Sequence, residues 1–254
     1  MKLSRLFVLF SDLKGICGTF VFILLVWQAW IELAHVSSII APSPLDVFTG
    51  LMENWPTLLG AAWDTLKIAL LGLVLGQALG FLLACLAWIS PFIGGLLLPG
   101  VLVAQSVPVV AMVPVIARLI GYDIRSVIAI TVLISFFPAY VFVRSGLNRL
   151  PAGAEDLFSV LGTSRRDKLL HLAIPAAIPG LLTALRLSAA NCVLATLVAE
   201  FLMGTQGLGF LIAFSAPRLD LQTGWGAALL ALMISLTLFA IASSLEQSLR
   251  DRWL

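Results

Sequence analysis

The chain has 254 residues, of which 61% are hydrophobic and only 11% are charged. Soluble domains average about 45–50% apolar and about 25% charged residues, so lipid must cover part of this chain's apolar surface. The net charge of +2 is spread along the chain, which excludes a nucleic-acid-binding patch. Three widely spaced cysteines exclude a disulfide framework and a paired-cysteine zinc site.

Six apolar segments are each long enough to cross a hydrocarbon core, which takes about 20 residues of helix. No barrel-type alternation is present, so these segments are expected to be helices and the fold an all-α membrane protein. Asp12 and Lys14 interrupt the first apolar run, which favours an uncleaved first span over a signal peptide. A single domain, 1–254, is expected, with spans near 16–34, 62–87, 96–120, 126–146, 178–203 and 225–246.

Basic residues indicate the orientation of these spans. They gather before the first span, between the fourth and fifth spans, and after the sixth, whereas the opposite connections hold only three arginines near span ends. Cytoplasmic loops are enriched in Lys and Arg, so both termini and the loop 147–177 are predicted to be cytoplasmic. The segment 41–56 is expected outside the membrane, extended or turn-like at its ends with a short helical stretch between them.

Glycines and prolines indicate how the spans pack. The second span carries Gly72, Gly76 and Gly80 at four-residue spacing, which gives one helix face a flat stripe for close helix packing. A stripe that lines a substrate path is the alternative. The third span contains three prolines and the fourth contains Pro138; such breaks either line a translocation route or simply kink the helices for packing.

The loop 147–177 can form a helix, a turn and a second helix. The first helix can start at Pro151, and Gly162 ends it where a left-handed residue is wanted. Thr163 or Ser164 can cap the second helix, which Pro175 is expected to stop. The first helix has one apolar face, made by Ala154, Leu157, Phe158 and Leu161, with Glu155 and Asp156 at its N-terminus and Arg165, Arg166 and Lys168 in the second helix.

Two interpretations of this loop are open on physical grounds. An amphipathic helix followed by a basic one can lie on anionic lipid. The same pair can instead dock into a cytoplasmic partner, with Leu157, Phe158 and Leu161 as apolar anchors in a groove.

The residues of this loop resemble the cytoplasmic signature loop of ABC importer permeases. The stretch Asp156-Leu-Phe-Ser-Val-Leu-Gly162 is followed by the tetrad Leu172-Ala-Ile-Pro175, whose proline lies thirteen residues after the glycine. The acidic position is Asp156 rather than the usual glutamate, and Leu157 and Phe158 replace the usual alanines. The resemblance extends to three further motifs of the nitrate/sulfonate/taurine-type branch: Ala41-Pro-Ser-Pro44, Val198-Ala-Glu200 and Gly207-Leu-Gly209.

This resemblance implies a type I importer permease in the bacterial inner membrane, working as a homodimer. It also implies two cytoplasmic ATPase subunits, which bind the ATP and magnesium, and an extracytoplasmic solute-binding protein. The ATPases would switch the pore between inward- and outward-facing states through the loop. On this basis the ATPase-coupling residues are Asp156, Leu157, Phe158, Leu161, Gly162, Thr163, Ser164, Arg165 and Pro175.

The chain has no catalytic or metal-binding motif. A Gly-x-x-x-x-Gly-Lys-Ser/Thr phosphate loop and a Gly-x-Ser-x-Gly elbow are both missing from the sequence. The two histidines, His35 and His171, lie far apart in the sequence, so neither a metal cluster nor a histidine-based triad is expected. No cofactor is expected on this chain.

A few polar residues fall inside the apolar spans. Glu200 should face protein or water, because an ionised acid at a span's centre costs roughly 2.5–3.5 kcal/mol. It is expected either to line a pore or gate, or to anchor the turn at 204–209, and Arg186 and Lys67 are its candidate partners. Asn191, Gln105 and Gln77 can line a path or join helices.

The sequence therefore predicts a permease subunit without its own ATPase, which moves a small polar or anionic solute, such as a sulfonate, taurine, nitrate or a pyrimidine. Two alternatives are an ion-coupled secondary transporter, which should show an inverted repeat, and a membrane scaffold that transports nothing.

Overall fold

The structure is a computed structural model that describes residue 18 and residues 21–35, 37, 40–150 and 152–253. All regular elements in these residues are helices, as the sequence predicts. The first expected span is described only in part, as an apolar helix at Val21–Leu33. The short extramembrane helix expected near 41–56 is α2, Pro44–Glu53, which Ser43 caps by accepting a hydrogen bond from the Asp46 backbone N–H.

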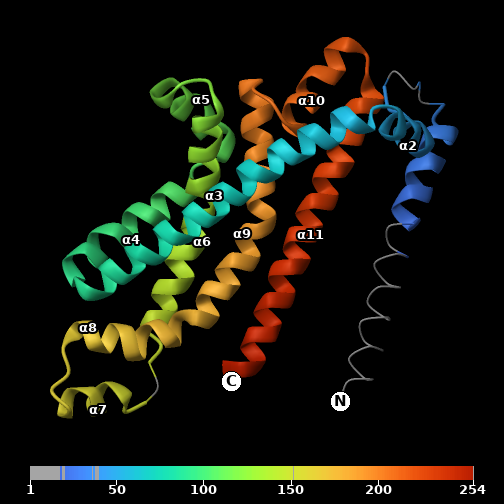
Figure 1. Cartoon of the computed structure of the whole chain (residues 1–254). Coiled ribbons are helices and arrows are strands. Elements are labelled where there is room, and N and C mark those ends of the chain that lie inside the picture. The colour runs from blue at the N-terminus through green and yellow to red at the C-terminus, as the bar shows by residue number, and fades with distance from the viewer. Residues whose placement is uncertain (1–17, 19–20, 36, 38–39, 151, 254) are drawn as a thin grey trace.

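Long apolar helices make up most of the chain. They are α3 (Trp55–Ile89), α6 (Ile124–Leu147), α9 (Ile174–Met203) and α11 (Leu221–Trp253). In Figure 1, α3 runs obliquely across α6 and α9, and α11 lies beside α9. Together with α8 and η1 at the start of α9, these helices give four candidate spans; one bent pair would make a fifth. The count of six remains a prediction, because the first span lies partly outside the described residues.

The bent pair is the third expected span, which is broken rather than continuous. It consists of α4 (Pro91–Ser106) and α5 (Val109–Ile120), whose axes are bent by 108°. Between them Val107 is extended, because the ring of Pro108 disfavours the helical region for the residue before it. Pro99, inside α4, leaves its helix continuous, so only one of the span's prolines makes the sharp break.

The glycine stripe allows α3 to approach α6 closely. A Cβ on Gly76 would lie 2.6 Å from the Val132 carbonyl oxygen, and one on Gly80 would lie 2.8 Å from the Phe136 carbonyl oxygen. A Cβ on Gly72 would meet the side chain of Thr131. These positions therefore have no room for a side chain, which is the pattern of helix packing in membranes.

The loop 147–177 contains α7 (Ala154–Val160), α8 (Arg165–Lys168) and a π-helical turn, η1 (Leu169–Ala173). Gly162 has a φ of 66° and ends α7 as expected, with the Thr163 N–H donating to the Phe158 carbonyl. The prediction that Pro175 stops the second helix is wrong, since α8, η1 and α9 form one helix from Arg165 to Met203. The π-helical turn precedes Pro175, and its wider bonding, Ile174 N–H to the Leu169 carbonyl, relieves the clash that a proline makes inside a regular helix.

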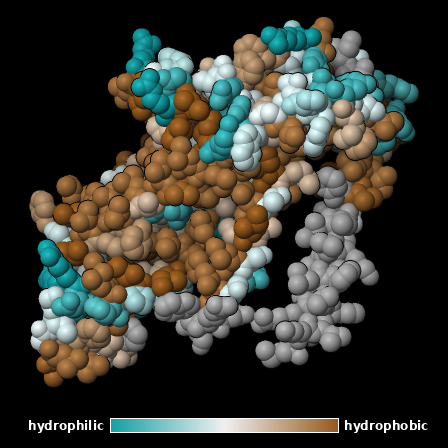
Figure 2. All heavy atoms as spheres, viewed as in Figure 1, coloured by the Kyte–Doolittle hydropathy of each residue, from teal (hydrophilic) through white to brown (hydrophobic). Residues whose placement is uncertain are grey.

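The chain ends with two short helices and α11. The short helices are α10 (Leu208–Ser215) and η2 (Ala216–Arg218). Figure 1 places α10 at the opposite end of the molecule from α7 and α8. Figure 2 shows a broad hydrophobic band between hydrophilic groups at these two ends, as expected of a protein embedded in lipid.

Candidate functional site

The apolar side chains of α7 project from the molecule instead of packing inside it. Leu157 is 57% exposed and Leu161 is 66% exposed, while Phe158 is half-buried. Val160, which the sequence analysis did not select, is 86% exposed. Figure 2 shows a hydrophobic patch at the tip of the molecule where Figure 1 places α7, beyond a hydrophilic zone. An exposed apolar patch of this kind marks an interaction site.

Polar contacts tie this tip to the membrane helices. Arg165 donates a hydrogen bond from its guanidinium to the Ile89 carbonyl at the end of α3, over 3.0 Å. Lys168 donates from Nζ to the Ser159 hydroxyl of α7, over 2.8 Å. Ser164 caps α8 by accepting from the Asp167 backbone N–H. Because α8 also continues into α9, the tip is continuous with a long apolar helix.

Asp156 and Thr163 complete the predicted coupling set within the described residues. The Asp156 side chain is exposed, and Thr163 donates from its hydroxyl to the Phe158 carbonyl over 2.6 Å, which stabilises the end of α7. Pro151, the expected start of the first helix, lies outside the described residues, and α7 begins at Ala154 instead. The structure thus brings most of the predicted coupling residues together on one helical elbow.

Glu200 lies at the opposite end of the molecule, in a network of its own. Its side chain is 0% exposed. The Thr65 hydroxyl donates to its carboxylate at 2.9 Å and 3.1 Å, and the Gly209 N–H donates at 3.0 Å. Thr65 in turn accepts from the Leu208 N–H at 2.8 Å. The carboxylate therefore joins α3, α9 and the first turn of α10.

Neither cation that the sequence suggested reaches Glu200. Lys67 pairs with Asp64 at 2.8 Å, and Arg186 pairs with Glu246 of α11 at 3.0 Å. Glu246 also accepts from the Thr183 hydroxyl at 2.8 Å. Neither candidate pairing with Glu200 is therefore formed, and the sequence did not predict the roles of Glu246 and Thr65. The sequence signal that could have indicated Glu246 is a carboxylate near the end of the sixth apolar span, since Arg186 lies in the span before it.

The neutral polar residues divide into two groups. Gln77 is buried and donates to the Ser188 hydroxyl at 2.9 Å, joining α3 to α9. Asn191 of α9 and Gln105 of α4 are exposed, although each lies in an apolar helix. Polar groups that face lipid are unfavourable, so these two require water or another protein surface.

Comparison with known proteins identifies the class. Residues 76–253 match the model of the family described as binding-protein-dependent transport system inner membrane component. This match covers well over half of the chain, so the protein belongs to that family of ABC importer permeases. Members of this family are transport subunits in the inner membrane rather than enzymes, and the ATPase lies in a separate subunit.

Two relatives and one solved structure illustrate the relationship. A probable ABC transporter permease protein of Haemophilus influenzae is 31% identical, over 85% of this chain and 89% of its own length. A formylaminopyrimidine transport permease protein of Halalkalibacterium halodurans is 27% identical, over 91% of this chain and 92% of its own length. The crystal structure of an amino acid ABC transporter with histidines superposes with a TM-score of 0.66 at 17% identity, covering 79% of this chain and 98% of that one. This structural match supports the fold, which is that of a type I importer permease.

Proposed function

We propose that this permease moves its solute by alternating access, which cytoplasmic ATPase subunits drive. These subunits bind the elbow formed by α7 and α8. The exposed apolar face of α7, fixed to a helix that continues into the membrane, is the observation that carries this proposal. Apolar anchors on a short helix suit a groove in a partner protein. ATP and magnesium would be bound by that partner.

The elbow and both termini are proposed to face the cytoplasm. The clustered basic residues favour this orientation. Cysteine labelling tests it: Ser159→Cys, in a background with Cys17, Cys85 and Cys192 replaced by serine, should react only with reagents that cross the membrane. Labelling of intact cells by an impermeant reagent would place the elbow outside and contradict the proposal.

A pore at the interface of a homodimer is proposed, with Asn191 and Gln105 facing it. Both side chains are exposed in the single chain, and a water-filled path would solvate them. Glu200 is buried in this conformation, so its geometry supports the anchor of the 204–209 turn over a pore-lining role. Through that anchor it would act on a gate only indirectly, by holding α10.

The solute is proposed to be a small polar molecule of the pyrimidine or sulfonate kind. The relative named for formylaminopyrimidine transport aligns over nearly the whole chain, which supports the first class. Recognition would rest largely on the binding protein that delivers the solute.

Reconstitution in liposomes tests the function. The permease, its ATPase and its binding protein are combined, and uptake of formylaminopyrimidine and of taurine is measured with and without ATP inside. Uptake that requires both ATP and the binding protein supports the proposal. Uptake by the permease alone under an ion gradient would indicate a secondary transporter. ATPase binding with neither uptake nor solute-stimulated hydrolysis would indicate a scaffold.

A further inference from the structure

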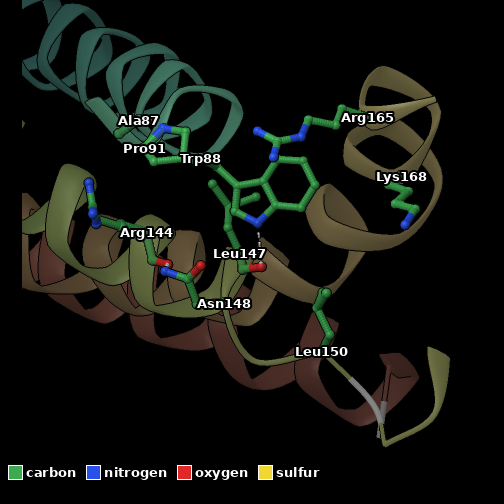
Figure 3. A pocket seen from close by; sticks show the side chains of 9 residues that line it. All are labelled: Ala87, Trp88, Pro91, Arg144, Leu147, Asn148, Leu150, Arg165 and Lys168. Carbon is green, nitrogen blue, oxygen red and sulfur yellow. Dashed lines mark hydrogen bonds between the residues drawn. The ribbon is translucent and has the colours of Figure 1, made fainter. Parts of the chain in front are cut away.

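A basic pocket lies where the elbow meets the membrane helices. It has a volume of about 480 Å³ and is lined by Ala87, Trp88, Pro91, Arg144, Leu147, Asn148, Leu150, Arg165 and Lys168. These residues come from the end of α3, the start of α4, the end of α6 with the residues just after it, and α8. In Figure 3 Arg144 lies on one side of Trp88 and Lys168 on the other, while the guanidinium of Arg165 lies by the indole ring. The pocket therefore spans the joint between the elbow and the bundle.

The charged side chains in the described lining of this pocket are all cations. Three of its lining residues are cations, and none of the lining residues that the structure describes is a carboxylate. Within the described part of the chain, none of the three forms an ion pair, although other cations of the chain do. Their hydrogen bonds go to neutral oxygens instead: Arg144 donates to the Tyr140 hydroxyl, Arg165 to the Ile89 carbonyl and Lys168 to the Ser159 hydroxyl. Like charges around one cavity create a field that attracts an anion.

The position of the pocket points to the membrane as the source of that anion. Trp88, at the last turn of an apolar helix, donates from its indole N–H to the Leu147 carbonyl and forms one wall (Figure 3). Tryptophan at a helix end is typical of the headgroup region. The volume falls within the roughly 300–1,000 Å³ of small-molecule sites, which suits a headgroup better than a bare phosphate.

We propose that this pocket binds the phosphate-bearing headgroup of an anionic lipid, with Arg144 and Lys168 as its charged ligands and Arg165 as a third. Basic pockets between membrane helices bind such headgroups. A headgroup held here joins α6 to α8, and thus the bundle to the elbow. Lipid binding at this site goes beyond the proposed function, and it can be measured without measuring solute transport.

Native mass spectrometry tests this proposal. The full-length permease is purified together with its transporter subunits, and the permease chain is then released from the complex in the mass spectrometer. Delipidated protein is titrated with phosphatidylglycerol, phosphatidylethanolamine or inorganic phosphate. Wild type should retain phosphatidylglycerol in preference to phosphatidylethanolamine. Arg144→Gln and Lys168→Gln should each weaken that retention about fivefold, and the double variant on the order of 25-fold.

Matched variants separate the site from general charge effects. Arg166→Gln removes a cation from the same helix but outside the pocket, and it should change retention by less than about twofold. Arg144→Lys should restore most of the binding if charge is what matters. Equal retention by wild type and the double variant would overturn the proposal. Binding of inorganic phosphate without any preference among lipids would contradict the lipid as the source.

Discussion

The two ends of this permease differ in how far their side chains find partners within the chain. At the α10 end, the carboxylate of Glu200 is buried and meets its hydrogen-bond donors within the chain. At the α7 end, apolar side chains lie exposed, and the described lining of a basic pocket holds three cations and no carboxylate. A polar group that is buried must find partners during folding, whereas exposed apolar surface gains stability only when a partner covers it. The difference separates an internal joint from the surface that we propose as the docking site.

Glu200→Ala gives the largest expected effect and tests whether the α10 end is self-contained. The substitution leaves the Thr65 hydroxyl and the Gly209 N–H buried without their acceptor. Each buried unsatisfied group costs about 1–3 kcal/mol, so the variant should lose about 2–6 kcal/mol of stability. Thermal unfolding in detergent should show a large drop in Tm.

Glu200→Gln is the matched variant, because it keeps one acceptor oxygen in nearly the same shape. It should lose less stability than the alanine variant. Its transport should fall only if the substitution displaces α10. A wild-type Tm in both variants would show that this network contributes nothing to the fold.

Phe158→Asp tests the opposite end, where the effect should fall on coupling instead of folding. A charge in the apolar anchor should weaken ATPase binding by about 30-fold or more, the level of an interface hot spot at 2 kcal/mol. Insertion and Tm should stay near wild type, because the residue is not fully buried. Co-purification with the ATPase and solute-stimulated ATP hydrolysis measure the effect.

Ser159→Asp is the control on the same helix. It adds the same charge within reach of Lys168, whose Nζ lies 2.8 Å from the Ser159 hydroxyl. Coupling in this variant should remain within about twofold of wild type, since surface ion pairs contribute little. If both aspartates abolished coupling equally, added charge on α7 would explain the loss and the apolar-anchor interpretation would fail.

Gly76→Ala probes the region between the two ends, where α3 and α6 pack closely through the glycine stripe. The new Cβ would lie 2.6 Å from the Val132 carbonyl oxygen, and backbone on both helices resists the shift. Overpacking of this kind costs about 1–3 kcal/mol. Gly60→Ala on the same helix has nothing within 4 Å of its Cβ and should be neutral or slightly stabilising. Equal Tm values for the two variants would contradict close packing at the stripe.

The helices and the turn at Gly162 could be predicted from the sequence, because the signals for them lie within a single helix or turn. The left-handed glycine at 162 and the small-residue stripe on α3 follow from rules that act within one helix or turn. The broken third span followed only in part: three prolines were visible, but only Pro108 separates two helices. The π-helical turn before Pro175 has no single-residue signature, which is why the expected stop was wrong.

Contacts between distant helices were beyond what the sequence could predict. Thr65 lies 135 residues from Glu200, and no local pattern relates the two. Glu246 is separated from its arginine by 60 residues for the same reason. The basic pocket combines residues from four segments, so its charge is visible in the sequence while its enclosure depends on the fold.

Ser164→Ala has the smallest expected effect, and it tests how stiff α8, the connection between the elbow and α9, must be. The serine hydroxyl accepts from the Asp167 N–H and donates to the Asp167 carboxylate at 2.6 Å, so its loss removes the cap of α8. An N-cap contributes about 1 kcal/mol, and hydrogen exchange at 165–168 should rise about fivefold. Ser164→Asp retains a capping oxygen and should restore protection.

If α8 transmits force from the elbow to α9, the alanine variant should also hydrolyse ATP with weaker stimulation by solute, although Phe158 and the apolar face are untouched. Faster exchange with full stimulation would instead show that the docked partner stiffens α8, and that the elbow is completed only on binding.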